Sequence, residues 1–182
     1  MSYVGHQLEV ECRKNLGHCR KSSALWKHQL LSAPKPGLPE MKVLFVCIKN
    51  ASRSPMAAAL LKMWAKRGVE VFSAGIKPGR KVNKQAVNAM REIGYDLSRH
   101  EPTHISHFSD SKFDYTAKMD VPDLGDMVTA KWIADWDIPD PAQGGIAEYR
   151  KIRQMIADKI GSELPQLLMQ QRKRRRRKRV KA

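Results

Sequence analysis

Short apolar runs alternate with longer amphipathic segments through the middle of the chain. Residues 43–46 form a continuous apolar run, and residues 69–75 alternate between apolar and polar side chains, so both segments are predicted to be strands. Two further runs, residues 113–119 and 131–136, are predicted to be the third and fourth strands. The pattern therefore predicts a sheet of four strands.

Three segments carry apolar residues at helical spacing. The first covers about residues 55–66, with Pro55 suited to the first turn. The second begins with Asn83 as its N-cap and is closed by Gly94, and the third covers about residues 146–168. Because strands alternate with helices, the sequence predicts a single α/β domain of three layers, in which helices flank a four-stranded parallel sheet.

Two polar segments have no clear period. Residues 99–111 are predicted to be a solvated loop. A metal site is the alternative for its histidines, His100, His104 and His107, but no helix or strand fixes their geometry. The sequence therefore predicts no metal and no other bound cofactor. The second polar segment, residues 121–130, is predicted to bridge the third and fourth strands as a short helix or a lid.

The chemistry predicted for the chain lies in the connection between the first strand and the first helix. Cys47 ends the strand, residues 48–52 form a tight loop, and Arg53 stands where the helix begins. Backbone N–H groups of such a loop and of a helix start make a concave anion site, and they favour the thiolate form of Cys47. Arg53 adds a planar donor fork for two oxygens of a tetrahedral oxyanion, which the thiolate could then attack. The alternative is a buried cysteine with no chemical role.

Three motifs resemble those of the low-molecular-weight tyrosine phosphatase superfamily, which includes the arsenate reductases built on the same fold. They are Cys47-x5-Arg53-Ser54, Ser73-Ala74-Gly75 and Trp136-Asp-Ile-Pro-Asp140-Pro141, and they occur in the family order. The resemblance covers about residues 41–168 and implies the low-molecular-weight phosphatase fold. In such a sheet the ligand site lies at the carboxyl ends of the strands.

The resemblance implies a chemical role for the main residues of these motifs. Cys47 would be the nucleophile, Arg53 would hold the oxyanion, and Asp140 would protonate the leaving oxygen. Asp137 is the alternative acid, and a purely structural role in the turn is open for both aspartates.

The resemblance also identifies the residues that shape the loop. Ser54 and Ser73 would hydrogen-bond Asn50, a residue type that tolerates a left-handed backbone. The alternative for Ser73 is an exposed strand position with no such role. The loop and its supports would then be Ile48, Lys49, Asn50, Ala51, Ser52, Ser54 and Ser73.

Departures from the phosphatase pattern bear on the substrate. Ala142 stands after the Asp-Pro pair, where tyrosine phosphatases of this family carry an aromatic residue, and Ser52 stands where many have a second cysteine. Lys49 replaces the usual glycine and adds positive charge at the mouth of the site. Residues 73–82 also resemble the arsenate reductase branch. These departures favour a small, doubly charged oxyanion over a bulky phosphopeptide.

The cysteines distinguish two routes within the reductase branch. Thioredoxin-linked members relay oxidation through two further cysteines after the third strand, and residues 119–127 contain none, so an internal relay would need Cys12 or Cys19. The resemblance therefore favours an arsenate reductase of the single-cysteine thiol-transfer type, with a low-molecular-weight thiol and a redoxin as co-substrates. The alternative is a protein-tyrosine or aryl phosphatase, which hydrolyses a phosphomonoester through a phosphocysteine at Cys47.

The net charge of +16 is concentrated at one end of the chain. Nine positive side chains lie in residues 172–181, and residues 171–182 are predicted to be a basic, disordered tail. A run of this kind can bind nucleic-acid phosphates without sequence preference. An alternative from another functional class is therefore a nucleic-acid-binding protein on an inactive domain.

Residues 1–40 are predicted to be a flexible extension that ends in a proline-rich linker, or the product of a start codon placed too early. Cys12 and Cys19 are not spaced as in common zinc sites, and with Cys47 they do not suggest a disulfide framework. No segment resembles a secretory signal, and no apolar run approaches the roughly 18 residues of a membrane span. The sequence therefore predicts a cytoplasmic protein, with no membrane partner, whose domain covers residues 41–170.

Overall fold

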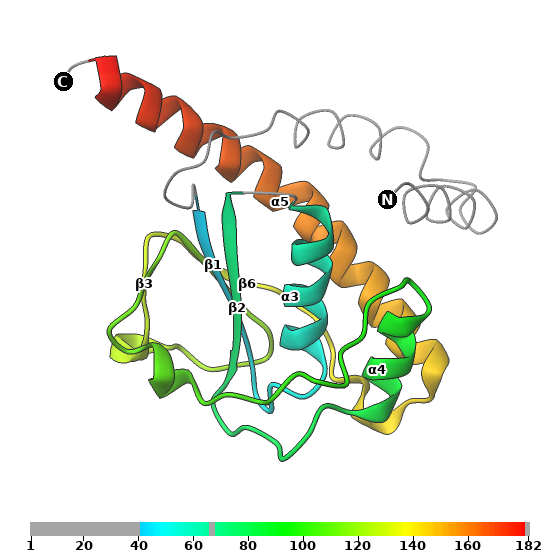
Figure 1. The fold of residues 1–182 in the computed structure, drawn as a ribbon. Helices are drawn as coiled ribbons and strands as arrows, with labels where there is room; N and C mark the ends of the chain where they lie inside the picture. Colours follow the sequence, from blue (N-terminus) through cyan, green and yellow to red (C-terminus); the bar gives the residue numbers. More distant parts are fainter. Residues whose placement is uncertain (1–40, 66–67, 181–182) are drawn as a thin grey trace.

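A parallel sheet of four strands forms the centre of the structure, which is a computed structural model describing residues 41–65 and 68–180, with side chains up to residue 169. The strand order is β2 (Val69–Gly75), β1 (Met41–Cys47), β4 (Tyr115–Lys118) and β6 (Ile133–Asp135), and all pairs are parallel (Figure 1). The predicted four-stranded parallel sheet is thus confirmed. The predictions for residues 1–40, with Cys12 and Cys19, lie outside the described residues.

The side chains of β1 alternate between two apolar cores, as the two-residue period of a strand requires. Val43, Phe45 and Cys47 face one core, whereas Leu44 and Val46 face the other. All five are buried, which explains why the sequence shows a continuous apolar run here instead of an alternating one. Cys47 therefore lies on the same face of the sheet as the first core.

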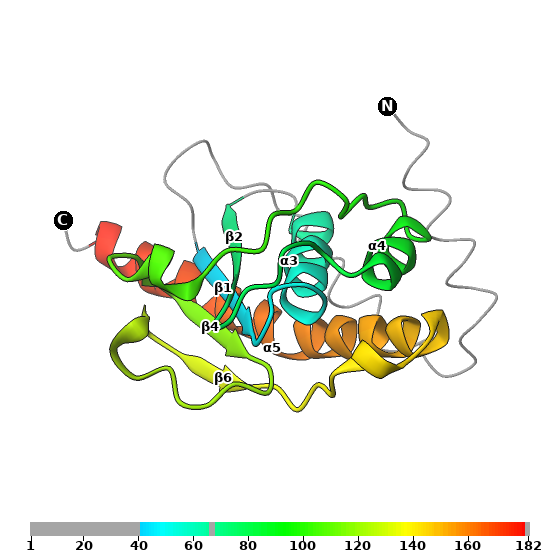
Figure 2. The same ribbon diagram turned by 90° about the horizontal axis from the view of Figure 1, so that it is seen from below.

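The first core is covered by three helices, α3 (Arg53–Trp64), α4 (Lys84–Arg91) and α5 (Ile146–Val180), which lie on one face of the sheet (Figure 2). Asn83 caps α4 as predicted, because its side chain accepts a hydrogen bond from Gln85 N at 2.8 Å. In α5 the backbone stays helical through the basic segment to Val180, where the sequence predicted a disordered tail. Lysine and arginine are good helix formers, which accounts for the difference. None of the described helices has both the length and the apolar composition to cross a membrane.

The second core is covered by the chain between α4 and β6, which forms no α-helix there. It contains two 3₁₀ helices, η1 (Ile105–Phe108) and η2 (Gly125–Met127), and a small parallel pair of β3 (Lys112–Phe113) with β5 (Thr129–Ala130). The third predicted strand is divided at Asp114, whose backbone and side chain both bond the backbone of Lys42. This capping interaction takes Asp114 out of the ladder and separates β3 from β4.

A buried polar cluster joins the sheet to α5. The Tyr115 hydroxyl donates to the Glu163 carboxylate, and Trp136 Nε1 donates to Tyr115 at 3.1 Å and to Glu163 at 3.0 Å. Burial, and then the Glu163 carboxylate, raise the pKa of Tyr115, so its hydroxyl remains a donor at ordinary pH. The cluster satisfies three polar groups beside the fully buried Trp136 ring.

Tyr115→Phe is expected to lower the free energy of unfolding by about 1–3 kcal/mol, because it removes a hydrogen bond to a carboxylate without opening a cavity. Urea unfolding followed by circular dichroism would measure the loss. Tyr149→Phe is the matched control, since Tyr149 is equally buried but its hydroxyl has no hydrogen-bond partner among the described residues; the Ser52 hydroxyl is nearby without that geometry. The control is expected to be neutral or stabilising, and equal losses in both variants would contradict the assigned role of the cluster.

Candidate active site

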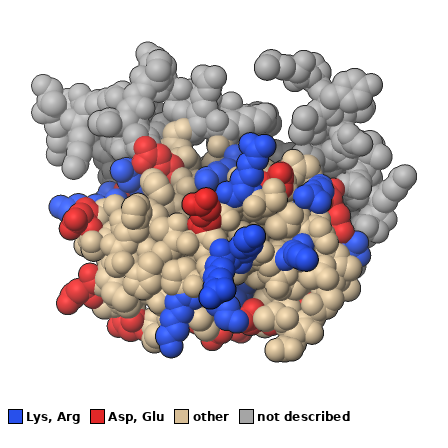
Figure 3. Space-filling model, turned by 60° about the horizontal axis from the view of Figure 1, so that its bottom comes forward, with Lys and Arg blue, Asp and Glu red and all other residues tan. Residues whose placement is uncertain are grey.

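The loop of residues 48–52, called the anion loop below, connects β1 to α3 at the carboxyl edge of the sheet, a face rich in Lys and Arg (Figure 3). The backbone carbonyls of this loop accept hydrogen bonds from residues 76–83, the segment that follows β2 and is called the strap below. Lys77 N, Gly79 N and Asn83 N each donate at 2.8 Å, to the carbonyls of Ile48, Lys49 and Ala51. In the described part of the chain, the backbone N–H groups of residues 49–52 donate to no backbone carbonyl. The strap therefore orients the loop carbonyls outward and leaves N–H groups for an anion.

The start of α3 adds to this anion site. Ser52 stands at the N-cap but its side chain makes no capping hydrogen bond, and the first turn of α3 contains no acidic residue. The positive end of the helix dipole is therefore available to a ligand in the loop. Lys49 is exposed, while Ile48, Ala51 and Ser52 are partly buried, so Lys49 contributes its charge from the solvent side.

Asn50 fixes the shape of the anion loop from a left-handed backbone conformation, with φ of 48°. Its Nδ2 donates to Ser54 Oγ at 2.8 Å, as predicted, and its Oδ1 accepts from Thr103 N at 2.9 Å. His100 Nε2 completes the set at 3.1 Å from the same oxygen, so this nitrogen must carry the proton. Burial, and then nearby Lys62, lower the pKa of His100 and favour the neutral ring.

Two expectations for this support are therefore corrected. Ser73 is buried in β2, but among the described residues it makes no hydrogen bond to Asn50. His100, predicted to be solvated, is half-buried and takes that place together with Thr103. The two residues reach Asn50 because β2 pairs its end with residue 104, which brings the loop after α4 against the anion loop. In the described ranges no three His, Cys, Asp or Glu side chains are grouped as a metal site would require.

Cys47 and Ser54 form the floor of the site. The Cys47 sulfur lies 3.0 Å from Ser54 Oγ, which also lies 3.2 Å from the carbonyl of Ala74. A hydroxyl has one proton, so Ser54 can donate to Ala74 while the thiol donates to Ser54, or it can donate to a Cys47 thiolate. Rotation of a single hydroxyl therefore accommodates both protonation states of Cys47.

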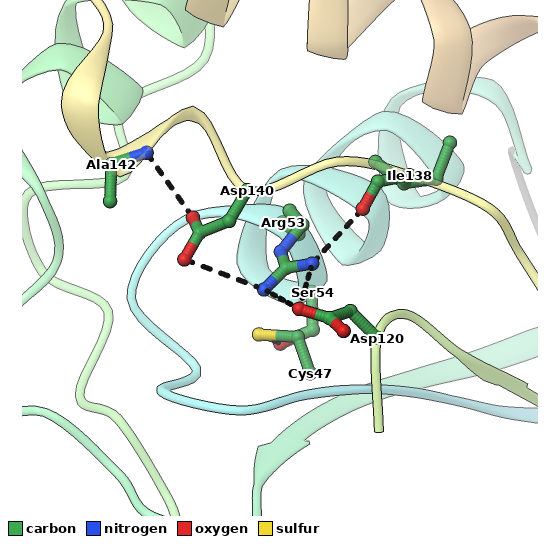
Figure 4. A network of polar contacts seen from close by, with 7 residues as sticks. All are labelled: Cys47, Arg53, Ser54, Asp120, Ile138, Asp140 and Ala142. Carbon is green, nitrogen blue, oxygen red and sulfur yellow. Dashed lines mark hydrogen bonds and ion pairs between the residues drawn. The ribbon is translucent and has the colours of Figure 1, made fainter. Parts of the chain in front are cut away.

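Arg53 stands over Cys47 with its side chain 3% exposed. Its Nη1 donates to the carbonyl of Ile138 at 3.0 Å and lies 3.4 Å from Asp120 Oδ2, and its Nη2 lies 3.6 Å from Asp140 Oδ2 (Figure 4). These contacts hold the guanidinium plane in one orientation. Asp120 was not predicted, although it closely follows the third predicted strand, at the sheet edge where ligands bind.

Asp140 is the predicted acid that the structure brings to the site. Its Oδ1 accepts from Ala142 N at 3.2 Å at the start of η3 (Pro141–Gln143), which leaves Oδ2 facing Arg53. Figure 4 shows the Asp140 carboxylate and the Cys47 sulfur on the same side of the guanidinium. Asp137, the predicted alternative, is exposed and makes no contact with Arg53 in the described part of the chain.

Gly75 ends β2 directly against the anion loop. A Cβ at this position would lie 2.8 Å from both the backbone nitrogen of Asn50 and the carbonyl oxygen of Ile48. Both atoms belong to the backbone, so relief of the clash would require the loop itself to move. The glycine of the Ser73-Ala74-Gly75 motif is thus explained by close approach.

Gly75→Ala is expected to lower the free energy of unfolding by about 1–3 kcal/mol through overpacking, and to weaken binding of inorganic phosphate at the loop. Thermal unfolding and calorimetric titration with phosphate would measure the two effects. The control is Gly161→Ala in α5, where a Cβ would have open space and should stabilise the helix by up to about 1 kcal/mol. Unchanged stability and phosphate affinity in Gly75→Ala would refute the assigned packing.

Comparison with known proteins agrees with this geometry. A family model described as low molecular weight phosphotyrosine protein phosphatase matches residues 42–177. A glutaredoxin arsenate reductase of Synechocystis sp. is 27% identical over 124 residues, which are 65% of this chain and 92% of the relative. An arsenate reductase of Staphylococcus aureus is 31% identical over 120 residues, 63% of this chain and 88% of the relative. A solved structure of an arsenate reductase in the phosphate binding state superposes with a TM-score of 0.63 at 27% identity, over 70% of this chain and 98% of that one. Since the family match covers most of its length, the chain belongs to the low molecular weight phosphotyrosine protein phosphatase family and is a cysteine-dependent enzyme of that family.

Proposed function

We propose that the protein reduces arsenate by the single-cysteine thiol-transfer route, through Cys47, Arg53 and Asp140. The observation that carries the proposal is that Cys47 is the only cysteine in the described part of the chain. With no second thiol in that part to take over the oxidation, the reducing equivalents come from other molecules. The arsenate reductases among the relatives support arsenate as the substrate, and the glutaredoxin arsenate reductase of Synechocystis sp. supports a redoxin as partner.

In the first step, the Cys47 thiolate attacks arsenic while the anion loop and Arg53 hold the other oxygens. One arsenic–oxygen bond breaks, and that oxygen leaves as water after taking a proton from Asp140 and one from the oxyanion. Arsenic remains at oxidation state five, now bonded to the Cys47 sulfur. The exposed position of Asp140 beside Arg53 suits a group that must exchange protons with solvent.

In the second step, a low-molecular-weight thiol displaces Cys47 from arsenic and gives a thiol–arsenic(V) adduct. A redoxin thiolate then attacks the sulfur of this adduct, and the electron pair of the sulfur–arsenic bond passes to arsenic. Arsenite leaves, and the two sulfurs form a mixed disulfide that is reduced away from the enzyme. A reducing compartment such as the cytoplasm keeps Cys47 free for the next cycle.

Arsenite production by the purified protein tests this proposal. Arsenate would be supplied with thioredoxin, with glutathione and glutaredoxin, and with mycothiol and its redoxin in parallel reactions, with Cys47→Ser as the control. Turnover with a low-molecular-weight thiol that disappears in the variant is the expected result. Absence of arsenite in every mixture, together with Cys47-dependent cleavage of p-nitrophenyl phosphate, would overturn the proposal.

Cleavage of p-nitrophenyl phosphate without arsenite formation would indicate the alternative function, a protein-tyrosine or aryl phosphatase. The description of the family supports it, since the same loop and Asp140 would form and hydrolyse a phosphocysteine. Ala142 is exposed beside Pro141 and offers no aromatic wall for a phenyl ring, which favours arsenate. Non-specific nucleic-acid binding by residues 172–182 is a separate proposal, tested by deleting them and measuring both activity and nucleic-acid retention.

Asp140→Asn is expected to lower kcat about 10²–10⁴-fold with little change in KM, because it removes the proton donor and keeps the shape. The loss should be larger for phenyl phosphate than for p-nitrophenyl phosphate, whose leaving group departs without a proton. Steady-state kinetics on both esters would measure the difference. Asp137→Asn is the control and should retain full activity; equal losses in the two variants would remove Asp140 from its assigned role.

A further inference from the structure

A basic groove of about 750 Å³ lies beside the anion loop. One of its walls is formed by the strap and α4, and the other by residues 98–102. Five cationic side chains line it: Arg80, Lys81, Lys84, Arg91 and Arg99. Glu101 is the acidic residue of the lining, and Val82, Val87 and Pro102 add apolar surface. Figure 3 shows the band of Lys and Arg across this face of the molecule.

The positive charge of the basic groove is largely uncompensated. Arg91 is 3.9 Å from Asp96, whereas no described carboxylate lies within ion-pair distance of Arg80, Lys84 or Arg99. All of these side chains are exposed, so an anion can reach them without displacing an internal partner. A concave surface of one charge attracts and concentrates small ions of the opposite charge.

Two walls of the basic groove are bonded to the anion loop. Arg80 to Val82 lie between Gly79 and Asn83, which both donate to carbonyls of the loop, and His100 donates to Asn50. The groove therefore adjoins the anion loop on the side of the strap and His100.

The size and lining of the basic groove restrict its ligand. Its volume falls in the range typical of small-molecule sites. A single nucleic-acid strand needs a longer basic track with aromatic platforms, and the lining contains no Phe, Tyr or Trp. Cations spread along the groove match a molecule with two separated carboxylates, and the valines match a short aliphatic stem.

We propose that the basic groove binds the two carboxylates of a low-molecular-weight thiol and presents its sulfur to Cys47. This inference rests on the proposed function, because it names the thiol class of the second step. In that step the thiol sulfur bonds to arsenic as the bond between Cys47 and arsenic breaks, and the thiol proton passes to the departing Cys47 sulfur. Arg80 and Lys84 act by positioning the thiol and take no part in bond exchange.

The double variant Arg80→Gln/Lys84→Gln tests the proposal, with Lys112→Gln/Lys151→Gln as a control that removes two exposed charges elsewhere. In the groove variant, KM for glutathione should rise about tenfold, as expected for two exposed charge contacts, with KM for arsenate unchanged. Glutathione with both carboxylates esterified should react poorly with both proteins. Unchanged KM for glutathione, or a rise in KM for glutaredoxin instead, would overturn the proposal.

A binding measurement separates this proposal from the proposed function. S-methylglutathione cannot react, so its calorimetric binding is measurable whether or not arsenite forms. Binding to the wild-type protein that is lost in the groove variant and at high salt supports the groove as a dicarboxylate site. Absence of binding, or equal binding to both proteins, refutes it, while absence of arsenite in every mixture refutes only the reductase.

Discussion

Cys47→Ser is expected to abolish turnover of both arsenate and aryl phosphates, lowering kcat/KM by about 10⁴-fold or more. Serine places an oxygen where the sulfur was, but among the described residues no basic side chain is hydrogen-bonded to this position to remove its proton. The groups next to Cys47 are the Ser54 hydroxyl at 3.0 Å and the N–H groups of the anion loop, which stabilise a thiolate but cannot generate an alkoxide. Stopped-time assays of arsenite and of p-nitrophenol would measure the loss.

The same variant should still bind inorganic phosphate. Arg53, the anion loop and the start of α3 are untouched by the exchange, and serine occupies less space than cysteine. Calorimetric titration should therefore give a dissociation constant within a few-fold of that of the wild-type protein. More than about 1% residual turnover would contradict the role of Cys47 as nucleophile, and lost phosphate binding would show a distorted loop.

The sequence predicted the centre of this site because the evidence for it is local. An apolar strand, a five-residue loop and a proline-started helix follow each other directly, and together they position Cys47 and Arg53 at the carboxyl edge of the sheet. Asn50 was predicted for its tolerance of a left-handed backbone and is found with φ of 48°. Asp140 was predicted from its motif, Trp136-Asp-Ile-Pro-Asp140-Pro141, and is found beside Arg53.

The parts that were missed depend on contacts between distant segments. His100 and Thr103 lie in a polar stretch without periodicity, and only the pairing of Gly75 with His104 brings that stretch to Asn50. Asp120 reaches Arg53 because β4 lies next to β1 in the sheet, an order that the sequence pattern does not specify. Tertiary register, not local propensity, therefore decided these positions.

Arg53→Lys is expected to lower kcat/KM by about 10²–10³-fold, although it keeps the positive charge. The guanidinium is held flat by the carbonyl of Ile138 and by long contacts to the carboxylates of Asp120 and Asp140, and an oxyanion that displaced these carboxylates would meet N–H groups lying in one plane. A lysine ammonium is a single point donor that cannot contact these partners and two oxyanion oxygens at once. Steady-state kinetics and phosphate titration would show a higher KM, a lower kcat and weaker phosphate binding.

The comparison with Arg53→Gln separates charge from geometry at this position. If charge alone mattered, lysine would retain nearly full activity and glutamine would lose it. If the planar pair of donors matters, as these contacts indicate, lysine and glutamine should both lose most of the activity, and added guanidinium should restore part of it. Retention of more than about one fifth of wild-type kcat/KM in Arg53→Lys would show that a point charge is sufficient, and the bidentate hold on the oxyanion would then have to be abandoned.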